Sequence, residues 1–270
     1  MNDILNVAAY KFVALDELPA LRARLRERAE ELELRGTILL SPEGLNLFIA
    51  GAESAVERLL DELISDPRLG ELNIKRSWSR EQPFNRMLVK IKKEIIAFGD
   101  FGIDPVNRPA PRVSAKELKA WLDAGREVVL LDTRNDYEVK LGTFSGARDF
   151  NIRHFRDFTS AAREQAADLA DKTVVTFCTG GIRCEKAAPF LIENGYKHVY
   201  QLDGGILAYF EQCGGAHYAG ECFVFDRRVA LDPNLEETGT VQCFNCLSPL
   251  ALEEQQSPAY VPDVSCPYCA

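Results

Sequence analysis

Residues 173–184 constrain the fold of this chain more than any other stretch, and they read TVVTFCTGGIRC. Strand-forming residues from Val174 to Phe177 lead directly into a cysteine, a glycine pair and an arginine. A helical pattern follows from Glu185 to Asn194. Because glycine adopts φ values that other residues resist, the loop can curl so that its backbone N–H groups face one point. The stretch therefore predicts a strand, a tight loop and a helix.

Cys178 stands where the predicted strand meets the loop, and we predict that it is a nucleophile. Backbone donors, the positive end of the following helix and the Arg183 guanidinium all favour thiolate over thiol. The Cys-x4-Arg spacing is one residue shorter than the Cys-x5-Arg phosphate loop of cysteine phosphatases, which suits a single sulfur. The alternative is a small buried apolar cysteine. The predicted active-site loop consists of Thr179, Gly180, Gly181, Ile182 and Arg183.

From Val128 onward, strand patterns alternate with helical ones, which predicts a parallel sheet with helices on both faces. Asp132 and Arg134 follow a neighbouring strand, so they either face the Cys178 loop or form an ion pair that fixes its shape. Cys184 lies in the first turn after the loop. It either resolves an oxidised Cys178 or packs in the core.

The first hundred residues follow the order βαββαβ, which indicates a ferredoxin-like, acylphosphatase-like sandwich. Strands are predicted at 7–15, 37–40, 45–50, 74–78 and 87–91, with helices over 18–34 and 52–65. A proline-spaced stretch near residue 105 reads as a stiff linker. We therefore predict an α/β chain with a ferredoxin-like domain at 1–103, a linker at 104–112, a parallel-sheet domain with helices on both faces at 113–218 and an irregular cysteine-rich tail at 219–270.

The composition is that of a soluble globular protein, with 270 residues, 46% hydrophobic residues and eight cysteines. No export signal or membrane span is apparent, which indicates a cytoplasmic protein with reduced thiols. The net charge of −9 disfavours a protein that coats nucleic acid, yet residues 75–93 hold seven basic side chains against one acid. This run is either an RNA-binding surface or a solvated strand face with Trp78 in the core. The RNA-binding candidates are Lys75, Arg76, Trp78, Arg80, Arg86, Lys90, Lys92 and Lys93.

Two Cys-x2-Cys pairs lie near the end of the chain, separated by nineteen residues. Each pair offers two thiolates to one tetrahedral ion, so this spacing is typical of a structural zinc ribbon. Free or redox-active cysteines are the alternative. The predicted metal ligands are Cys243, Cys246, Cys266 and Cys269.

Several motifs together resemble a known family. The cysteine loop, the string at 132–134 and the Gly204-Gly205 pair resemble rhodaneses, whose cysteine carries a persulfide, and this resemblance implies a rhodanese domain at 113–218. The longer strings CTGGIRCEKA at 178–187, SPEGLN at 41–46 and GECFVFD at 220–226 resemble the bacterial tRNA uridine hydroxylases built on a rhodanese domain.

This resemblance implies oxygen-dependent 5-hydroxylation of the wobble uridine of tRNA, with Cys178 essential and tRNA as partner. Molecular oxygen is then a co-substrate, and a reductant or sulfur donor is needed. No flavin or nicotinamide fingerprint is present, so no organic cofactor is predicted. Two alternatives remain. One is a sulfurtransferase that carries a persulfide on Cys178. The other is a non-catalytic rhodanese-fold binding module.

Overall fold

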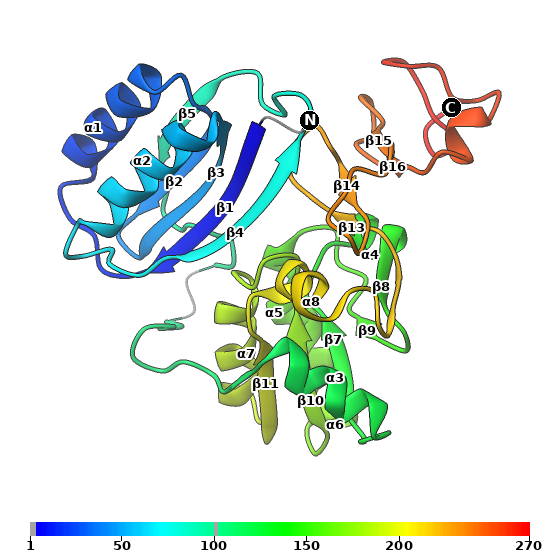
Figure 1. Cartoon of the computed structure of the whole chain (residues 1–270). Helices are drawn as coiled ribbons and strands as arrows, with labels where there is room; N and C mark the ends of the chain where they lie inside the picture. The colour runs from blue at the N-terminus through cyan, green and yellow to red at the C-terminus, as the bar shows by residue number, and fades with distance from the viewer. Residues whose placement is uncertain (1–3, 100–101) are drawn as a thin grey trace. The chain divides into compact units, whose positions relative to one another are not determined.

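A computed structural model describes residues 4–99 and 102–270. Residues 1–3 and 100–101, which belong to the predicted first domain, lie outside the described residues. The chain divides into two compact units, Met1–Pro109 and Ala110–Ala270 (Figure 1). The division falls inside the predicted linker.

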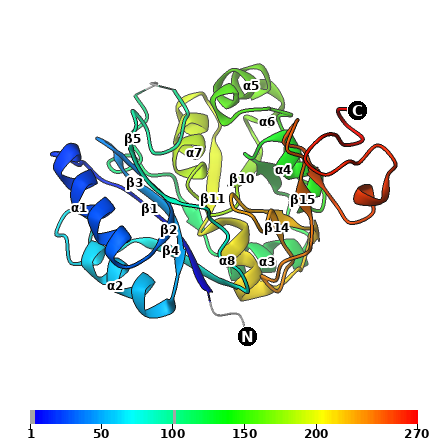
Figure 2. The same ribbon diagram turned by 90° about the horizontal axis from the view of Figure 1, so that it is seen from above.

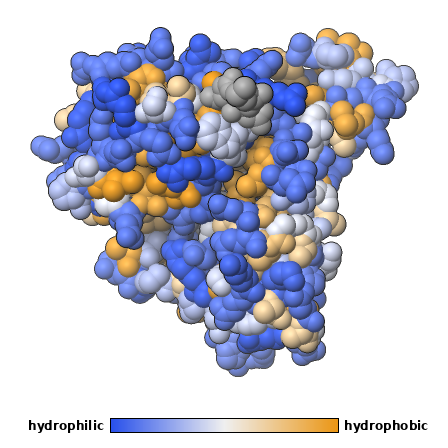
Figure 3. All heavy atoms as spheres, in the orientation of Figure 1, coloured by the Kyte–Doolittle hydropathy of each residue, from blue (hydrophilic) through white to orange (hydrophobic). Residues whose placement is uncertain are grey.

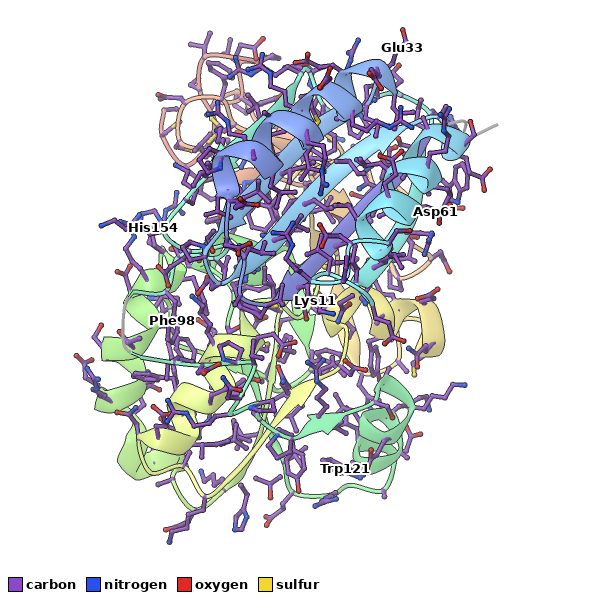
Figure 4. All side chains as sticks on the ribbon, turned by 90° about the vertical axis from the view of Figure 1, so that its left-hand side faces the viewer. Lys11, Glu33, Asp61, Phe98, Trp121 and His154 are labelled. Atoms are coloured by element: carbon purple, nitrogen blue, oxygen red, sulfur yellow. The ribbon has the colours of Figure 1, made fainter. Side chains whose placement is uncertain are left out.

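The first unit is one five-stranded sheet covered on one face by two helices (Figure 4). The sheet has the order β4-β1-β3-β2-β5, with β5 parallel to β2 and the other pairs antiparallel. The first four strands confirm the ferredoxin-like prediction, and β5 extends the sheet. The elements are β1 (Ile4–Phe12), α1 (Leu18–Glu31), β2 (Arg35–Ser41), β3 (Gly44–Gly51), α2 (Glu53–Ile64), β4 (Asn73–Ser79) and β5 (Met87–Ile91).

The core of this unit lies between the sheet and the helices. Leu21 and Leu25 of α1 and Leu59 and Leu60 of α2 are buried in one apolar cluster with the inner face of the sheet. The predicted first strand is shifted: it was expected at 7–15 and ends at Phe12. Residues 13–15 instead hydrogen-bond to the turn between β2 and β3. Val13 N donates to the Glu43 carbonyl (2.9 Å), and Leu15 N donates to that of Pro42 (3.1 Å).

The second unit contains a parallel sheet in the order β6-β11-β10-β7-β9, as predicted. Helices α3 and α8 contact each other, as do α5 and α7, and the two pairs cover opposite faces of the sheet (Figure 1). The elements are β6 (Arg112–Val113), α3 (Ala115–Asp123), β7 (Val129–Asp132), α4 (Asp136–Leu141), β8 (Gly142–Phe144), β9 (Arg148–Asp149), η1 (Phe155–Asp157), α5 (Phe158–Glu164), α6 (Ala166–Leu169), β10 (Thr173–Phe177), α7 (Cys184–Glu193), β11 (His198–Leu202) and α8 (Gly205–Cys213).

Short strands that pair in twos follow α8. Strand β12 pairs with β8, β13 with β14, and β15 with β16. The C-terminal segment that carries β15 and β16 lies beside α4 (Figure 2). The elements are β12 (Tyr218–Gly220), β13 (Cys222–Phe223), β14 (Ala230–Leu231), β15 (Val241–Gln242), β16 (Pro249–Leu250) and η2 (Glu254–Gln256). No helix in the described ranges has the length and apolar character needed to cross a membrane.

Candidate functional site

Cys178 lies at the carboxyl end of β10, where the chain turns through the loop into α7. The loop is held from the side by the start of α8, because Ile206 N donates to the Cys178 carbonyl (2.9 Å) and Leu207 N to that of Thr179 (3.0 Å). A Cβ on Gly205 would stand 2.4 Å from the Cys178 carbonyl oxygen, so only glycine permits this approach. The Gly204-Gly205 pair thus belongs to the site.

The Cys178 sulfur is buried and receives hydrogen bonds from the loop. Gly181, with φ of 97°, directs its N–H to Sγ at 3.1 Å. Burial alone opposes the thiolate, but a hydrogen bond from the Cys184 thiol, the charge of Arg183 and the N–H groups of Arg183 and Gly181 outweigh it. Together they lower the pKa of Cys178 to about 6. The geometry therefore stabilises a thiolate at neutral pH.

The thiol of Cys184 keeps its proton and lies beside that thiolate. It is buried at the start of α7, and its sulfur lies 3.7 Å from the Thr133 hydroxyl. Burial, followed by the hydrogen bond and the charge of Cys178, raises the pKa of Cys184 well above its usual range. Cys184 therefore donates to Cys178 while the thiolate is present.

Arg183 points to a carboxylate that the sequence analysis did not assign to the site. Its guanidinium binds Glu138 of α4 through two hydrogen bonds of 2.6 and 2.7 Å, and both side chains are buried. Glu138 also accepts from Asn135 N (3.1 Å) in a capping box. The positive charge of Arg183 is thus partly offset by Glu138. The available signal was the Asn135-x-x-Glu138 spacing, which marks a helix start but not a buried acid.

Asp132 and Arg134 form a fully buried ion pair with Nη2 to Oδ2 of 2.7 Å. Arg134 also donates to the Gly142 carbonyl (2.6 Å), and Asp132 accepts from the Thr143 hydroxyl (2.8 Å). Both side chains therefore bind β8, and in this way they connect the segment after β7 with β8. The ion pair named as one alternative in the sequence analysis is therefore present.

The basic run at 75–93 is split by the sheet topology. Strands β4 and β5 form the two opposite edges of the first sheet, because β4 pairs with β1 and β5 with β2. Lys75, Arg76, Trp78 and Arg80 lie on or just after β4, whereas Arg86, Lys90, Lys92 and Lys93 lie at or beside β5. The run therefore supplies basic side chains to two separate edges of the sheet, and its role in RNA binding stays a prediction.

The β4 edge also differs from expectation in detail. Trp78 is 38% exposed, so its ring does not face the core. Arg76 binds Glu57 of α2 through Nε to Oε1 at 2.9 Å, and Lys75 binds Asn73. The β5 edge presents three exposed lysines, Lys90, Lys92 and Lys93.

The four C-terminal cysteines come together as predicted. Their sulfur atoms all lie within 4.8 Å of one another. The recorded Sγ–Sγ distances are 3.8 Å for Cys243–Cys269, 3.5 Å for Cys246–Cys266 and 3.7 Å for Cys266–Cys269. Four sulfurs at the usual zinc–sulfur distance of about 2.3 Å form a tetrahedron with an edge of about 3.8 Å. The cluster therefore fits a tetrahedral metal ion.

The comparisons with known proteins cover nearly the whole chain. Residues 4–95 match the UPF0176 acylphosphatase like domain and residues 114–212 match the Rhodanese-like domain. A tRNA uridine(34) hydroxylase of Cupriavidus necator is 53% identical over 98% of this chain and 96% of its own length. One of Burkholderia ambifaria is 52% identical over 99% and 97%. The chain belongs to the tRNA uridine(34) hydroxylase family.

Solved structures resemble single parts of this family member. A rhodanese-like domain from Anabaena is 22% identical with a TM-score of 0.35, and it covers 41% of this chain and 79% of that one. An acylphosphatase from Coxiella burnetii is 17% identical with a TM-score of 0.28, and it covers 33% and 94%.

Proposed function

We propose that this protein hydroxylates C5 of the wobble uridine of tRNA in an oxygen-dependent reaction that requires Cys178. The observation that carries the proposal is the 53% identity, over 98% of the chain, to a protein named tRNA uridine(34) hydroxylase. The buried thiolate loop supports it, because Cys178 has a lowered pKa and so offers a nucleophile at neutral pH. A cytoplasmic location is part of this proposal, and the free cysteines and the proposed tRNA substrate support it.

The stoichiometry defines what else is needed. Uridine, one O₂, two electrons and two protons yield 5-hydroxyuridine and one water. The reaction therefore consumes a two-electron reductant, which is a partner or small molecule outside this chain. Within the chain, the loop N–H groups and Arg183 stabilise negative charge on the Cys178 sulfur, whether it is a thiolate or a persulfide.

The proposal is tested in cells that lack this protein and its activity. Expression of the chain in air should restore 5-hydroxyuridine to bulk tRNA, measured by nucleoside mass spectrometry. The same cells grown without oxygen should lack it. Turnover of thiosulfate to thiocyanate with no change in tRNA would instead identify a sulfurtransferase, since a persulfide carrier needs no oxygen.

We further propose that the β5 edge contacts the tRNA backbone. Its three lysines are exposed and adjacent, which suits a row of phosphates. Changing Lys90, Lys92 and Lys93 to glutamine should weaken tRNA binding and reduce the slope of log K against log[salt] by about 2, because each lost phosphate contact removes about 0.7 on single-stranded RNA. Arg80→Gln, on the β4 edge, is the comparison variant. An unchanged slope in the triple variant would contradict a phosphate-binding edge.

The metal that best fits the four-cysteine cluster is zinc, and we propose one structural zinc ion per chain. Four thiolates complete a tetrahedral shell, so the ion would be structural rather than catalytic. Backbone contacts support this arrangement, since Leu247 N donates to the Cys243 carbonyl (2.9 Å) and Tyr268 N to the Cys266 sulfur (3.4 Å). Apolar side chains such as Phe244 are exposed on this segment. Figure 3 shows apolar surface at its upper right, where the C-terminal segment lies. With so small a core, the ion would supply much of the segment's stability.

Purified protein should therefore contain about one zinc per chain by elemental analysis. Cys266→Ser should lower the zinc content several-fold, because Cys266 is fully buried and its sulfur lies close to those of both Cys246 and Cys269. Cys213→Ser, which lies outside the cluster, should leave zinc unchanged. Metal-free protein in which residues 240–270 still resist proteolysis would refute a structural zinc site.

A further inference from the structure

The β13–β14 hairpin carries a rigid tip beside the Cys178 loop. Val224 N donates to the Val229 carbonyl (2.8 Å), and Val229 N to that of Asp226 (3.0 Å). Within the tip, Asp226 accepts from the backbone N–H of Arg228 (3.0 Å) and from its Nε (2.8 Å), and both side chains are nearly buried. The hairpin is attached to the active-site loop, because the Thr179 hydroxyl donates to the Phe223 carbonyl (3.3 Å).

Two side chains of this tip face solvent. Phe225 is 47% exposed, and Arg227 is exposed two residues later, while Val224 and Arg228 are buried. The Phe225 ring packs edge-to-face on Phe223, with centroids 5.1 Å apart. A well-ordered hairpin therefore presents an aromatic ring and a cation to the outside.

The exposed ring lies beside the side chain of Arg183, a residue of the active-site loop. Arg183 Cζ is 5.7 Å from the centroid of Phe225, and the backbone N–H of Arg183 donates to the Cys178 sulfur. Below Phe225, the ring of Phe223 packs edge-to-face on Tyr137 of α4 at 5.4 Å. A flat ligand stacked on Phe225 would therefore lie beside the Arg183 side chain, which belongs to the loop that holds Cys178.

An exposed aromatic ring beside the loop suits a uracil that leaves the base stack of an anticodon loop. Cys178 is 1% exposed, so a base that remains stacked between its neighbours in the RNA cannot reach the sulfur. The base must leave the stack, and an aromatic side chain replaces the lost stacking. We propose that Phe225 stacks on the uracil of nucleotide 34 and that Arg227 binds an adjacent phosphate. This rests on the proposed function and adds the residues that recognise the base.

The base contact is tested by binding, without turnover, to an anticodon stem-loop with uridine at position 34 and to the same RNA with an abasic residue there. Wild-type protein should prefer the uridine RNA by about 5- to 150-fold, the range measured for stacking one base on an aromatic side chain. Phe225→Ala should remove that preference, and Phe225→Tyr should retain it. Phe244→Ala, at a 76% exposed aromatic outside the hairpin, is the control and should also retain it. An undiminished preference in Phe225→Ala would overturn the proposal.

The phosphate contact is tested by the salt dependence of binding, which the base contact does not change. Arg227→Gln should weaken binding of both RNAs equally and reduce the salt slope by about 0.7, the value for one phosphate on a single strand. A full slope in Arg227→Gln would remove Arg227 from the site. If cells make 5-hydroxyuridine but Phe225→Ala keeps its preference, the stacking assignment alone fails. If the preference depends on Phe225 but no hydroxyuridine forms, the hydroxylase assignment fails and the base site stands.

Discussion

Cys178→Ala is expected to abolish 5-hydroxyuridine formation, with at least a 1000-fold loss of rate, because removal of an enzymatic nucleophile typically costs about 10⁴ to 10⁶. Nucleoside analysis of tRNA from complemented cells measures the loss. Cys213→Ala removes a thiol of the same unit outside the loop and should keep full activity. Full restoration by Cys178→Ala would show that the sulfur takes no part in the reaction.

The reactivity of the same thiol should follow its pKa. Since the pKa of Cys178 lies at about 6, its thiolate is present above pH 6 and is lost as the pH falls below it. The rate of alkylation by iodoacetamide should therefore rise with a midpoint near pH 6 and level off by pH 7. Cys222, whose burial raises its pKa to about 12, should stay unreactive over the same range. A midpoint above pH 8 would contradict the stabilised thiolate.

Glu138→Gln is expected to destabilise the second unit by about 3–5 kcal/mol, because it leaves the buried guanidinium of Arg183 without its carboxylate. That loss corresponds to a decrease in melting temperature of roughly 6–20 °C for a unit of this size. Thermal unfolding followed by circular dichroism measures it. Asp171→Asn breaks an exposed ion pair with Lys197 and should cost at most about 1 kcal/mol.

A double variant separates charge from packing. Arg183→Met together with Glu138→Leu removes both charges, and buried pairs replaced by apolar residues are often no less stable. The double variant should therefore melt well above either single variant, Arg183→Met or Glu138→Leu. If the double variant were as unstable as the sum of the singles, the loss would come from packing around the loop rather than from an unpaired charge.

Local patterns predicted much of this protein. The strand, cysteine and glycine pair at 173–184 predicted a loop that stabilises a thiolate, because the backbone N–H of Gly181, the Arg183 charge and the Cys184 thiol all come from the six residues after Cys178. The βαββαβ order of the first unit and the alternating pattern of the second follow from periodicity in the same way. The spacing of the four cysteines predicted their clustering. Each Cys-x2-Cys pair holds its two sulfurs close together, so the four sulfurs form one cluster once the two pairs come into contact.

Only the tertiary structure decided how distant residues meet. Glu138 and Arg183 are 45 residues apart, and nothing in either segment marks them as partners. The residues of the basic run are close in sequence, yet the topology sends β4 and β5 to opposite edges of the sheet. Phe225 comes beside the Arg183 side chain through a hairpin whose Phe223 carbonyl accepts a hydrogen bond from Thr179, 44 residues earlier in the chain. Local patterns determine backbone conformation, whereas the pairing of strands and the burial of charges depend on the whole chain packing at once.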